Sequence, residues 1–392
     1  MGARVTLRDQ VETVLRSWND HEIDRGAPPV VDYDCHPQSA AGVKPASSRV
    51  AVRRELARLR AEAPTDAPAA VVDRISASLA YLDALLGARV PLVDYIRTTQ
   101  GCGAAGWSNE YIESARVRAV AALSQLEVPW DGETARALGD TEGAVPAADA
   151  ADVIQEYARE LEHDVRRYTD ADAPFRVTVE HVDLDVYWAY WLDGAGADVR
   201  LRINGRNAMF TQVQARQFAL HELLGHGLQC ASYAEECRTH DVPWVRMTSV
   251  HAQQQVLLEG LAQAMPLFLR PDDEPLIARV RLAHYVELVR SKLHLAINTS
   301  MSIPECVDLA RSLVPFWSDA QIGSMLTDRG ADPLLRSYLW SYPAGLDWFV
   351  RLADEAAPET AREVFRAAYR SPLTPTALAG LWPEGPTVGG DG

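Results

Sequence analysis

The chain has 392 residues, of which 47% are apolar and 23% charged, the ordinary balance of a folded protein with a sizeable hydrophobic core. It carries 38 basic and 54 acidic residues, a net charge of −16. This charge repels a phosphate backbone, so we expect no nucleic-acid partner. No stretch approaches the roughly 18 consecutive apolar residues of a membrane span, so we expect no membrane partner either.

The cysteines give no sign of a disulfide framework. There are five of them, they are scattered, and no two form a CxxC pair. An odd, scattered set is typical of a reducing compartment and predicts free thiols. The first residues, MGARVTLRDQVETVL, carry early charges and no apolar run before a small-residue cleavage site. We therefore expect a cytoplasmic protein.

Apolar residues at three-to-four spacing predict several helices before the middle of the chain. These predicted helices cover residues 5–18, 50–63, 68–86, 108–126 and 150–168. Residues 131–149 are rich in Gly, Ala and Asp and show no periodicity. We place a boundary there, between an N-terminal helical lobe of residues 1–149 and a catalytic helical lobe of residues 150–392.

Between residues 175 and 203 the apolar residues alternate, which predicts a ribbon of two or three strands with a turn at Asp193-Gly194. No other segment predicts strands. Helical patterns then resume at residues 212–232, 251–269, 276–298, 304–315, 319–328, 334–354 and 359–369. The predicted fold is mainly α, with one small β ribbon just before the most informative sequence.

That sequence is FALHELLGHG, in which the pair His221-Glu222 is followed by His226. Two imidazoles that hold a metal, with a carboxylate beside its bound water, are what a hydrolytic zinc site requires. In a regular α-helix, side chains five positions apart point about 140° apart, against about 40° for the familiar step of four. A one-residue π-bulge at Gly225 would restore the facing arrangement. The alternative is a pair of core histidines on an amphipathic helix.

A tetrahedral catalytic site takes three protein ligands and leaves one position open. Glu259, in the segment VLLEGLA, has apolar neighbours on nearly every helical face. Burying a bare carboxylate is costly unless it meets a cation, so we predict Glu259 as the third ligand. The alternative is a buried ion pair between Glu259 and an arginine. Competing ligands are Glu235, Glu236, Cys230, Cys237, His240 and His251.

The segment HELLGHG resembles the HExxGH motif of dipeptidyl peptidase III, which implies His221 and His226 as zinc ligands and Glu222 as general base. Residues from about 195 to 385 look more like a bacterial family of zinc peptidases with HExxPGHH and EGWALYAE motifs, related to carboxypeptidase Taq and the oligopeptidases. The resemblance implies a two-lobed helical zincin-like fold. Glu259 and the three residues after it match the start of the second motif. The chain lacks the Pro and one residue of HExxPGH, and it has Gly227, Ala264 and Pro266 where the family has His, Tyr and Glu.

Together these residues predict a zinc hydrolase that cleaves a peptide or small amide bond, with Glu222 as the base that takes the water proton. The stretch around residues 338–345 is similar to the Tyr-bearing region of the same peptidases. This similarity implies Tyr342 as donor to the tetrahedral intermediate, with Tyr338 and His294 as second choices. The same ligands could form a facial triad for Fe(II). If the ribbon lies beside the cleft, its edge could pair with an extended substrate.

Two other functions stay open. The first is a metal-dependent enzyme that acts on a small molecule, such as an amide hydrolase, lyase or cyclase of a specialised pathway. The altered surroundings of both motifs support it, and a screen of peptides against small amides would separate it from a peptidase. The second is a helical binding protein with a vestigial metal site, which would bind metal without an exchangeable water ligand.

Overall fold

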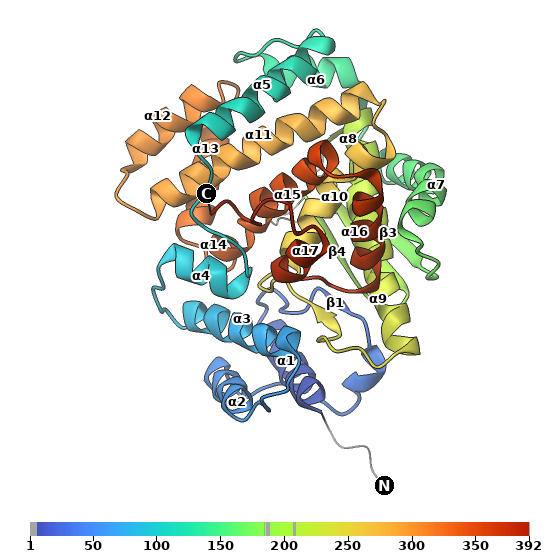
Figure 1. The fold of residues 1–392 in the computed structure, drawn as a ribbon, viewed down its shortest axis with the longest axis vertical. Helices are drawn as coiled ribbons and strands as arrows, with labels where there is room; N and C mark the ends of the chain where they lie inside the picture. Colours follow the sequence, from blue (N-terminus) through green and yellow to red (C-terminus); the bar gives the residue numbers. More distant parts are fainter. Residues whose placement is uncertain (1–5, 184, 186–188, 207–208, 392) are drawn as a thin grey trace.

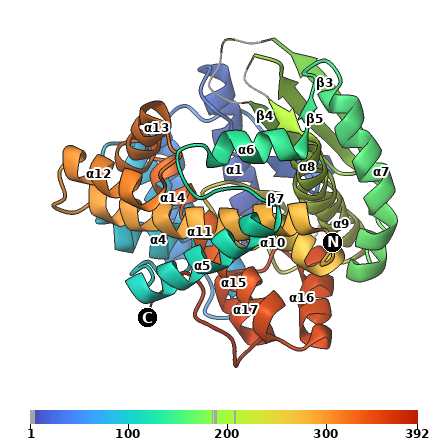
Figure 2. The same ribbon diagram turned by 90° about the horizontal axis from the view of Figure 1, so that it is seen from above.

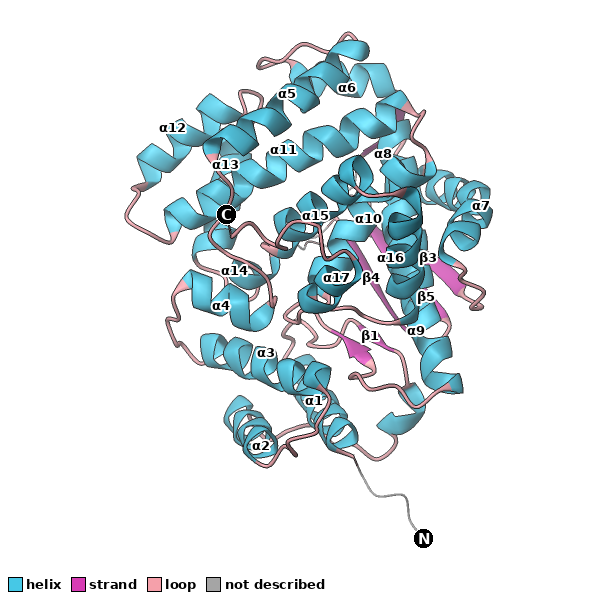
Figure 3. Ribbon diagram, viewed as in Figure 1, coloured by secondary structure: helices cyan, strands magenta, loops and turns pink. Residues whose placement is uncertain are grey.

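The computed structural model describes residues 6–183, 185, 189–206 and 209–391. Of these residues, 62% are helical and 8% lie in strands, and Figure 3 shows the strands as a small group among many helices. The predicted fold class, mainly α with a small sheet, is confirmed. The helices are α1 (Leu7–Asp24), α2 (Arg49–Ala61), α3 (Ala69–Leu85), α4 (Leu92–Thr99), α5 (Asn109–Gln125), α6 (Thr134–Glu142), α7 (Ala150–Thr169), α8 (Gln212–Phe218), α9 (Leu228–Thr239), α10 (Gln255–Leu269), α11 (Glu274–Ile297), α12 (Ile303–Leu313), α13 (Asp319–Gly330), α14 (Leu335–Tyr338), α15 (Ser341–Glu355), α16 (Pro358–Arg370) and α17 (Pro375–Leu381), with a 3-10 turn η1 (Pro37–Ala40) and a π-helix η2 (Ala219–Gly227).

Most of the predicted helices are present, but the prediction missed three short ones, α4, α6 and α17. Helix α4 spans only eight residues, too few for a clear periodic pattern. Helix α6 lies within residues 131–149, where the sequence predicts a lobe boundary. Helix α5 precedes that segment and α11 follows it, and these two helices pack against each other (Figures 1 and 2). The division into two lobes stays a prediction.

The main sheet has five strands in the order β3-β5-β4-β1-β7. The predicted ribbon at residues 175–203 contains β3 (Arg176–Val182), β4 (Tyr190–Ala195) and β5 (Asp198–Asn204). Strands β4 and β5 are antiparallel, whereas β3 runs parallel to β5. The prediction missed β1 (Tyr33–Asp34) and β7 (Met247–Thr248), which extend the sheet, and β2 (Ala144–Val145) and β6 (Phe210–Thr211), which pair with each other. Two-residue strands are too short to show alternation.

The predicted turn at Asp193-Gly194 is wrong. Gly194 lies inside β4, and the chain turns at Gly196, whose φ is +60°. A Cβ atom at Gly194 would lie 2.3 Å from the carbonyl oxygen of Asp198 and 2.4 Å from the Tyr33 ring. The glycine is therefore explained by the close approach of Tyr33 from β1, which the local sequence does not reveal.

The largest hydrophobic cluster surrounds α10 and includes residues of η2, α7, α15 and α16. Helices α10 and α15 cross at Gly260 and Gly345, where a Cβ on Gly260 would lie 2.3 Å from the Gly345 carbonyl carbon. Only glycine allows the two backbones to approach so closely. A second cluster joins α5, α11, α12 and α13, and a third joins α1, α2 and α3. Within the described residues, no helix is long and apolar enough to cross a bilayer.

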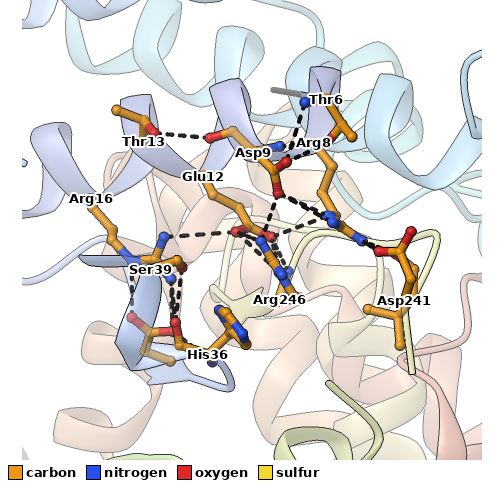
Figure 4. Close-up of polar contacts among 12 residues, drawn as sticks. Thr6, Arg8, Asp9, Glu12, Thr13, Arg16, His36, Ser39, Asp241 and Arg246 are labelled. Atoms are coloured by element: carbon orange, nitrogen blue, oxygen red, sulfur yellow. Dashed lines mark hydrogen bonds and ion pairs between the residues drawn. The ribbon is translucent and has the colours of Figure 1, made fainter. Parts of the chain in front are cut away.

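Ion pairs join α1 to the strands (Figure 4). Arg246, just before β7, donates from Nη2 to Glu12 Oε2 (2.7 Å) and to Asp9 Oδ1 (2.8 Å). Arg16 donates from Nη2 to Oδ1 of Asp34 in β1 (2.9 Å). Because Glu12 is buried, its pairing with Arg246 compensates the cost of removing the carboxylate from water. The N-terminal helices thereby hold β1 and β7 in place.

Candidate metal centre

The two histidines lie on the π-helical segment η2. Helix α8 begins with a capping box between Thr211 and Gln214 and continues directly into η2. In a π-helix the backbone bonds span five residues, so side chains five positions apart lie one above the other. A Cβ atom on Gly225 would lie 2.9 Å from the Ala262 Cβ of α10 and 2.9 Å from the Leu220 carbonyl oxygen. The predicted π distortion is confirmed, and the glycine also lets η2 pack closely against α10.

This geometry brings the predicted ligands together. Nε2 of His221 lies 3.1 Å from Nε2 of His226, and their ring planes make an angle of 85°. Glu259, on the neighbouring helix α10, places Oε2 at 3.4 Å from His221 Nε2 and 3.7 Å from His226 Nε2. One atom of each of these three residues therefore faces the same small space, although His221 and Glu259 are 38 positions apart in the chain.

The donor set fits a divalent metal. A tetrahedral centre with ligand distances of about 2.0–2.1 Å places its ligating atoms about 3.3 Å from one another, close to the separations among His221, His226 and Glu259. Oε2 of Glu259 is buried and, within the part of the chain that the structure describes, has no hydrogen-bond partner. A cation at this point would supply that missing partner. Nδ1 of His226 is also buried without a partner among those residues, so the second ring nitrogen is not anchored as it is in most metal sites.

The other oxygen of Glu259 is held by a pair of tyrosines. Tyr338 donates its hydroxyl proton to Glu259 Oε1 at 2.6 Å. Its hydroxyl oxygen lies 2.6 Å from that of Tyr342. A phenol has one proton to donate, and an ionised carboxylate has none, so Tyr342 is the donor to Tyr338. This chain of hydrogen bonds fixes the rotamer of Glu259 and directs Oε2 toward the histidines.

The two carboxylates of the site have opposite pKa shifts. Burial opposes ionisation of Glu259, but the adjacent His221 and His226 outweigh it and hold the pKa of Glu259 well below its usual value. Burial raises the pKa of Glu222, partly offset by the same histidines and reinforced by the charge of Glu259. A carboxylate with a raised pKa accepts protons more readily near neutral pH, as a general base must.

Glu222 competes with Glu259 as the carboxylate that could complete a metal site with the two histidines. One possible ligand atom from each of His221, Glu222 and His226 lies within 4.8 Å of the other two. Glu222 Oε1 is 3.6 Å from His221 Nε2. Glu259 lies nearer to His221 and is anchored by Tyr338, whereas no hydrogen bond of the Glu222 side chain is found among the described residues. Of the two carboxylates, the anchored Glu259 is therefore better suited to a ligand's position than Glu222.

Two cavities meet at the centre. The first has a volume of about 200 Å³ and is lined by Glu222, His226, Glu259, Tyr338 and Tyr342. Residues of strand β4 and of the segment 28–33 complete its wall. A second, of about 330 Å³, is lined by His221, Tyr342 and Tyr190 among others. Tyr190 and Tyr342 line both cavities. His221, His226 and Glu259 thus stand at the junction of two spaces that a substrate could enter.

The structure does not bring every predicted residue to the centre. His294 is buried in α11 with its ring against Trp340, 5.6 Å between centroids, and lines neither cavity. Among the competing ligands, His251 packs between Tyr81 and Trp18, and His240 pairs with Glu236 at 3.0 Å on the surface. Cys230 lines the smaller cavity. All five cysteines are free, as the scattered pattern predicts, and the structure shows that all five are buried.

Among the cavity-wall residues that sequence reasoning missed are Asp32 and Tyr190. Asp32 follows Val30-Val31 and precedes Tyr33, so an acidic residue inside a short apolar stretch was the available signal. Tyr190 had no distinguishing signal, since an aromatic residue in a strand is usually part of the core.

A comparison of the chain with protein-family models gave no match, and a comparison with curated proteins gave none either. The function is therefore inferred from the residues of the site.

Proposed function

We propose that the protein is a zinc-dependent hydrolase that cleaves a peptide or amide bond. The observation that supports this most directly is the convergence of His221 Nε2, His226 Nε2 and Glu259 Oε2 at separations of 3.1, 3.4 and 3.7 Å. Two histidines and one carboxylate are a common ligand set of catalytic zinc. The same set also occurs with Fe(II), so the metal itself has to be measured.

When bound, zinc would lower the pKa of a water molecule and polarise a carbonyl oxygen. Glu222, buried beside His221 on the cavity wall, is placed to take the proton of the attacking water and to return it to the leaving nitrogen. Tyr342 lines both cavities and would donate to the oxyanion of the tetrahedral intermediate after releasing Tyr338. The hydroxyl of Tyr338 continues to donate its hydrogen bond to Glu259, so its proposed role is to orient Glu259 as a metal ligand.

The sheet supports a peptide as the substrate. Strand β1 pairs with β4 only at Gly194 and Ala195. Tyr190, Trp191 and Leu192, the earlier residues of β4, line the cavity that contains Glu222 and Glu259. Within the described residues no strand pairs with this part of β4 on the β1 side. An extended peptide could add there as a further strand and so present its carbonyl to the site.

Glu222→Gln tests the proposal. This variant keeps the shape of the side chain but cannot act as a base, so we expect unchanged metal content and a loss of hydrolysis of about 10²- to 10⁴-fold. The measurement is a peptide-library digest read by mass spectrometry, with a parallel screen of small amides. Glu363→Gln, at an exposed position of α16, is the matched control. Equal turnover by Glu222→Gln and wild type would dismiss the base assignment, and cleavage of small amides alone would favour the small-molecule enzyme.

A further inference from the structure

Asp32 lies on the wall of the cavity that contains Glu222, His226 and Glu259, yet the mechanism above gives it no role. Its backbone position is fixed, because its N–H donates to the Thr248 carbonyl oxygen at 3.1 Å. The residues that follow it form β1, which pairs on both sides with other strands. The carboxylate is therefore held at a defined place in the cavity wall.

The carboxylate of Asp32 is incompletely paired. The backbone N–H of Val250 lies close enough to favour its ionised form, but its Oδ2 atom is buried and has no hydrogen-bond partner in the described part of the chain. Arg74 is nearby, yet its guanidinium donates to the Met247 carbonyl oxygen (3.3 Å) and to Ser249 Oγ. No ion pair joins Asp32 to Arg74 within the described ranges.

The electrostatics agree with an uncompensated acid. Burial raises the pKa of Asp32 to about 7, against the opposing effects of Arg74 and of the Val250 N–H, and the charge of Glu259 adds to the rise. A protein that needed Asp32 only as a structural ion would be expected to pair it fully. A positively charged group in the cavity would complete the missing interaction.

The rest of the cavity suits such a group. Its described lining includes three carboxylates, those of Asp32, Glu222 and Glu259, and neither a lysine nor an arginine. With one divalent cation at the histidines and Glu259, the charges of these three carboxylates sum to about −1 when all three are ionised. Tyr33 and Trp191 line the same space, and aromatic faces attract cations. An amine that carries apolar carbons therefore matches the cavity better than a carboxylate does.

We propose that Asp32 is the specificity-determining residue of this site and accepts a protonated nitrogen of the substrate. This inference rests on the proposed hydrolase function. The nitrogen is either the free α-amino group of a short peptide or the side-chain cation of a lysine or arginine residue, because both present the same charged N–H donors. The rival explanation is that Asp32 only anchors the Val250 N–H.

The test compares four peptides of one sequence: with a free α-amino group, N-acetylated, N-acetylated with one lysine, and N-acetylated with norleucine in its place. We expect at least one amine-bearing peptide to exceed its neutral partner in kcat/KM by about tenfold or more, the gain typical of a charged hydrogen bond. The pair that shows the gain identifies the source of the amine. Ratios near one in both pairs would overturn the proposal.

Asp32→Asn keeps an oxygen acceptor for the Val250 N–H but removes the charge, so it separates recognition from anchoring. We expect the amine-to-neutral ratio to collapse toward one in this variant. Asp32→Glu should retain the preference, as should Asp308→Asn at an exposed position of α12. An unchanged ratio in Asp32→Asn would overturn the assignment.

Calorimetric binding of the same four peptides to the purified full chain distinguishes the two proposals. Amine-dependent binding that Asp32→Asn abolishes, without any cleavage, would support Asp32 while dismissing the hydrolase. Cleavage of all four peptides at similar rates in wild type and Asp32→Asn would support the hydrolase while dismissing the role of Asp32.

Discussion

The hydroxyl of Tyr338 donates to Oε1 of Glu259 at 2.6 Å, and this bond leaves Oε2 of the same carboxylate facing His221 and His226 at 3.4 and 3.7 Å. One side chain thus fixes the orientation of the proposed third ligand. In metal sites, groups that orient a ligand commonly contribute 10- to 100-fold to affinity.

Tyr338→Phe should therefore weaken zinc binding by about 10- to 100-fold while leaving the fold intact, because it removes the donor to Glu259 and the acceptor of the Tyr342 proton but keeps the ring. Affinity is measured by competition with a chromophoric chelator. Tyr285→Phe is the matched control, since its hydroxyl donates to the Leu313 carbonyl oxygen in the separate α11–α12 cluster. Equal affinities of the two variants would show that Tyr338 does not support the ligand.

Gly260→Ala should destabilise the protein by more than about 3 kcal/mol, because the new Cβ would lie 2.3 Å from the backbone of Gly345. Gly323→Ala is the matched control. It lies in α13 with nothing within 4 Å of the new Cβ, and we expect it to stabilise by about 0.5–1 kcal/mol through helix propensity. Urea unfolding measures both free energies, and similar values for the two variants would contradict the close crossing of α10 and α15.

The buried acid of α15 should make stability depend on pH. Asp347 accepts hydrogen bonds from Tyr111 Oη (2.7 Å) and Trp107 Nε1 (2.8 Å) and lies 2.7 Å from His284 Nε2. Burial would raise the pKa of Asp347, but these partners, His284 foremost, outweigh it and lower the pKa. A lowered pKa gives stability that is complete above the unfolded value of about 4 and is lost as the pH falls through the folded value.

Asp347→Asn should therefore cost about 3–5 kcal/mol near neutral pH and lose part of the acid dependence of the free energy of unfolding. Urea unfolding at several pH values between about 3 and 7 measures both effects. Asp308→Asn, exposed on α12, should change neither. An Asp347→Asn protein whose stability follows the wild-type pH curve would refute this role of the acid.

The sequence was sufficient for those parts of the site that depend on local spacing. His221 and His226 lie five positions apart with Gly225 before the second, which predicts the π distortion, and an acidic residue in the apolar helix α10 predicts the burial of Glu259. Most helices follow from periodicity in the same way.

Other features depend on contacts between distant segments and could not be predicted. Asp32 reaches the cavity only because β1 pairs with β4 and β7, more than 150 residues away. The pair Asp193-Gly194 is typical of a turn. Gly194 instead lies inside β4, where a glycine is needed because the Tyr33 ring approaches closely. His294 lies in α11, whose residues belong to two hydrophobic clusters, and it packs against Trp340 of the largest one, a contact that periodicity does not predict.

Metal content is the most direct test of the central claim, that His221, His226 and Glu259 together hold one catalytic ion. The measurement is elemental analysis of the full chain purified without added metal, compared with Glu259→Ala and His226→Ala prepared in the same way. We expect about one equivalent of zinc per chain in the wild type and a small fraction of that in both variants. Stoichiometric metal in either variant, or a wild-type protein that takes up no divalent metal even when it is supplied, would contradict the claim.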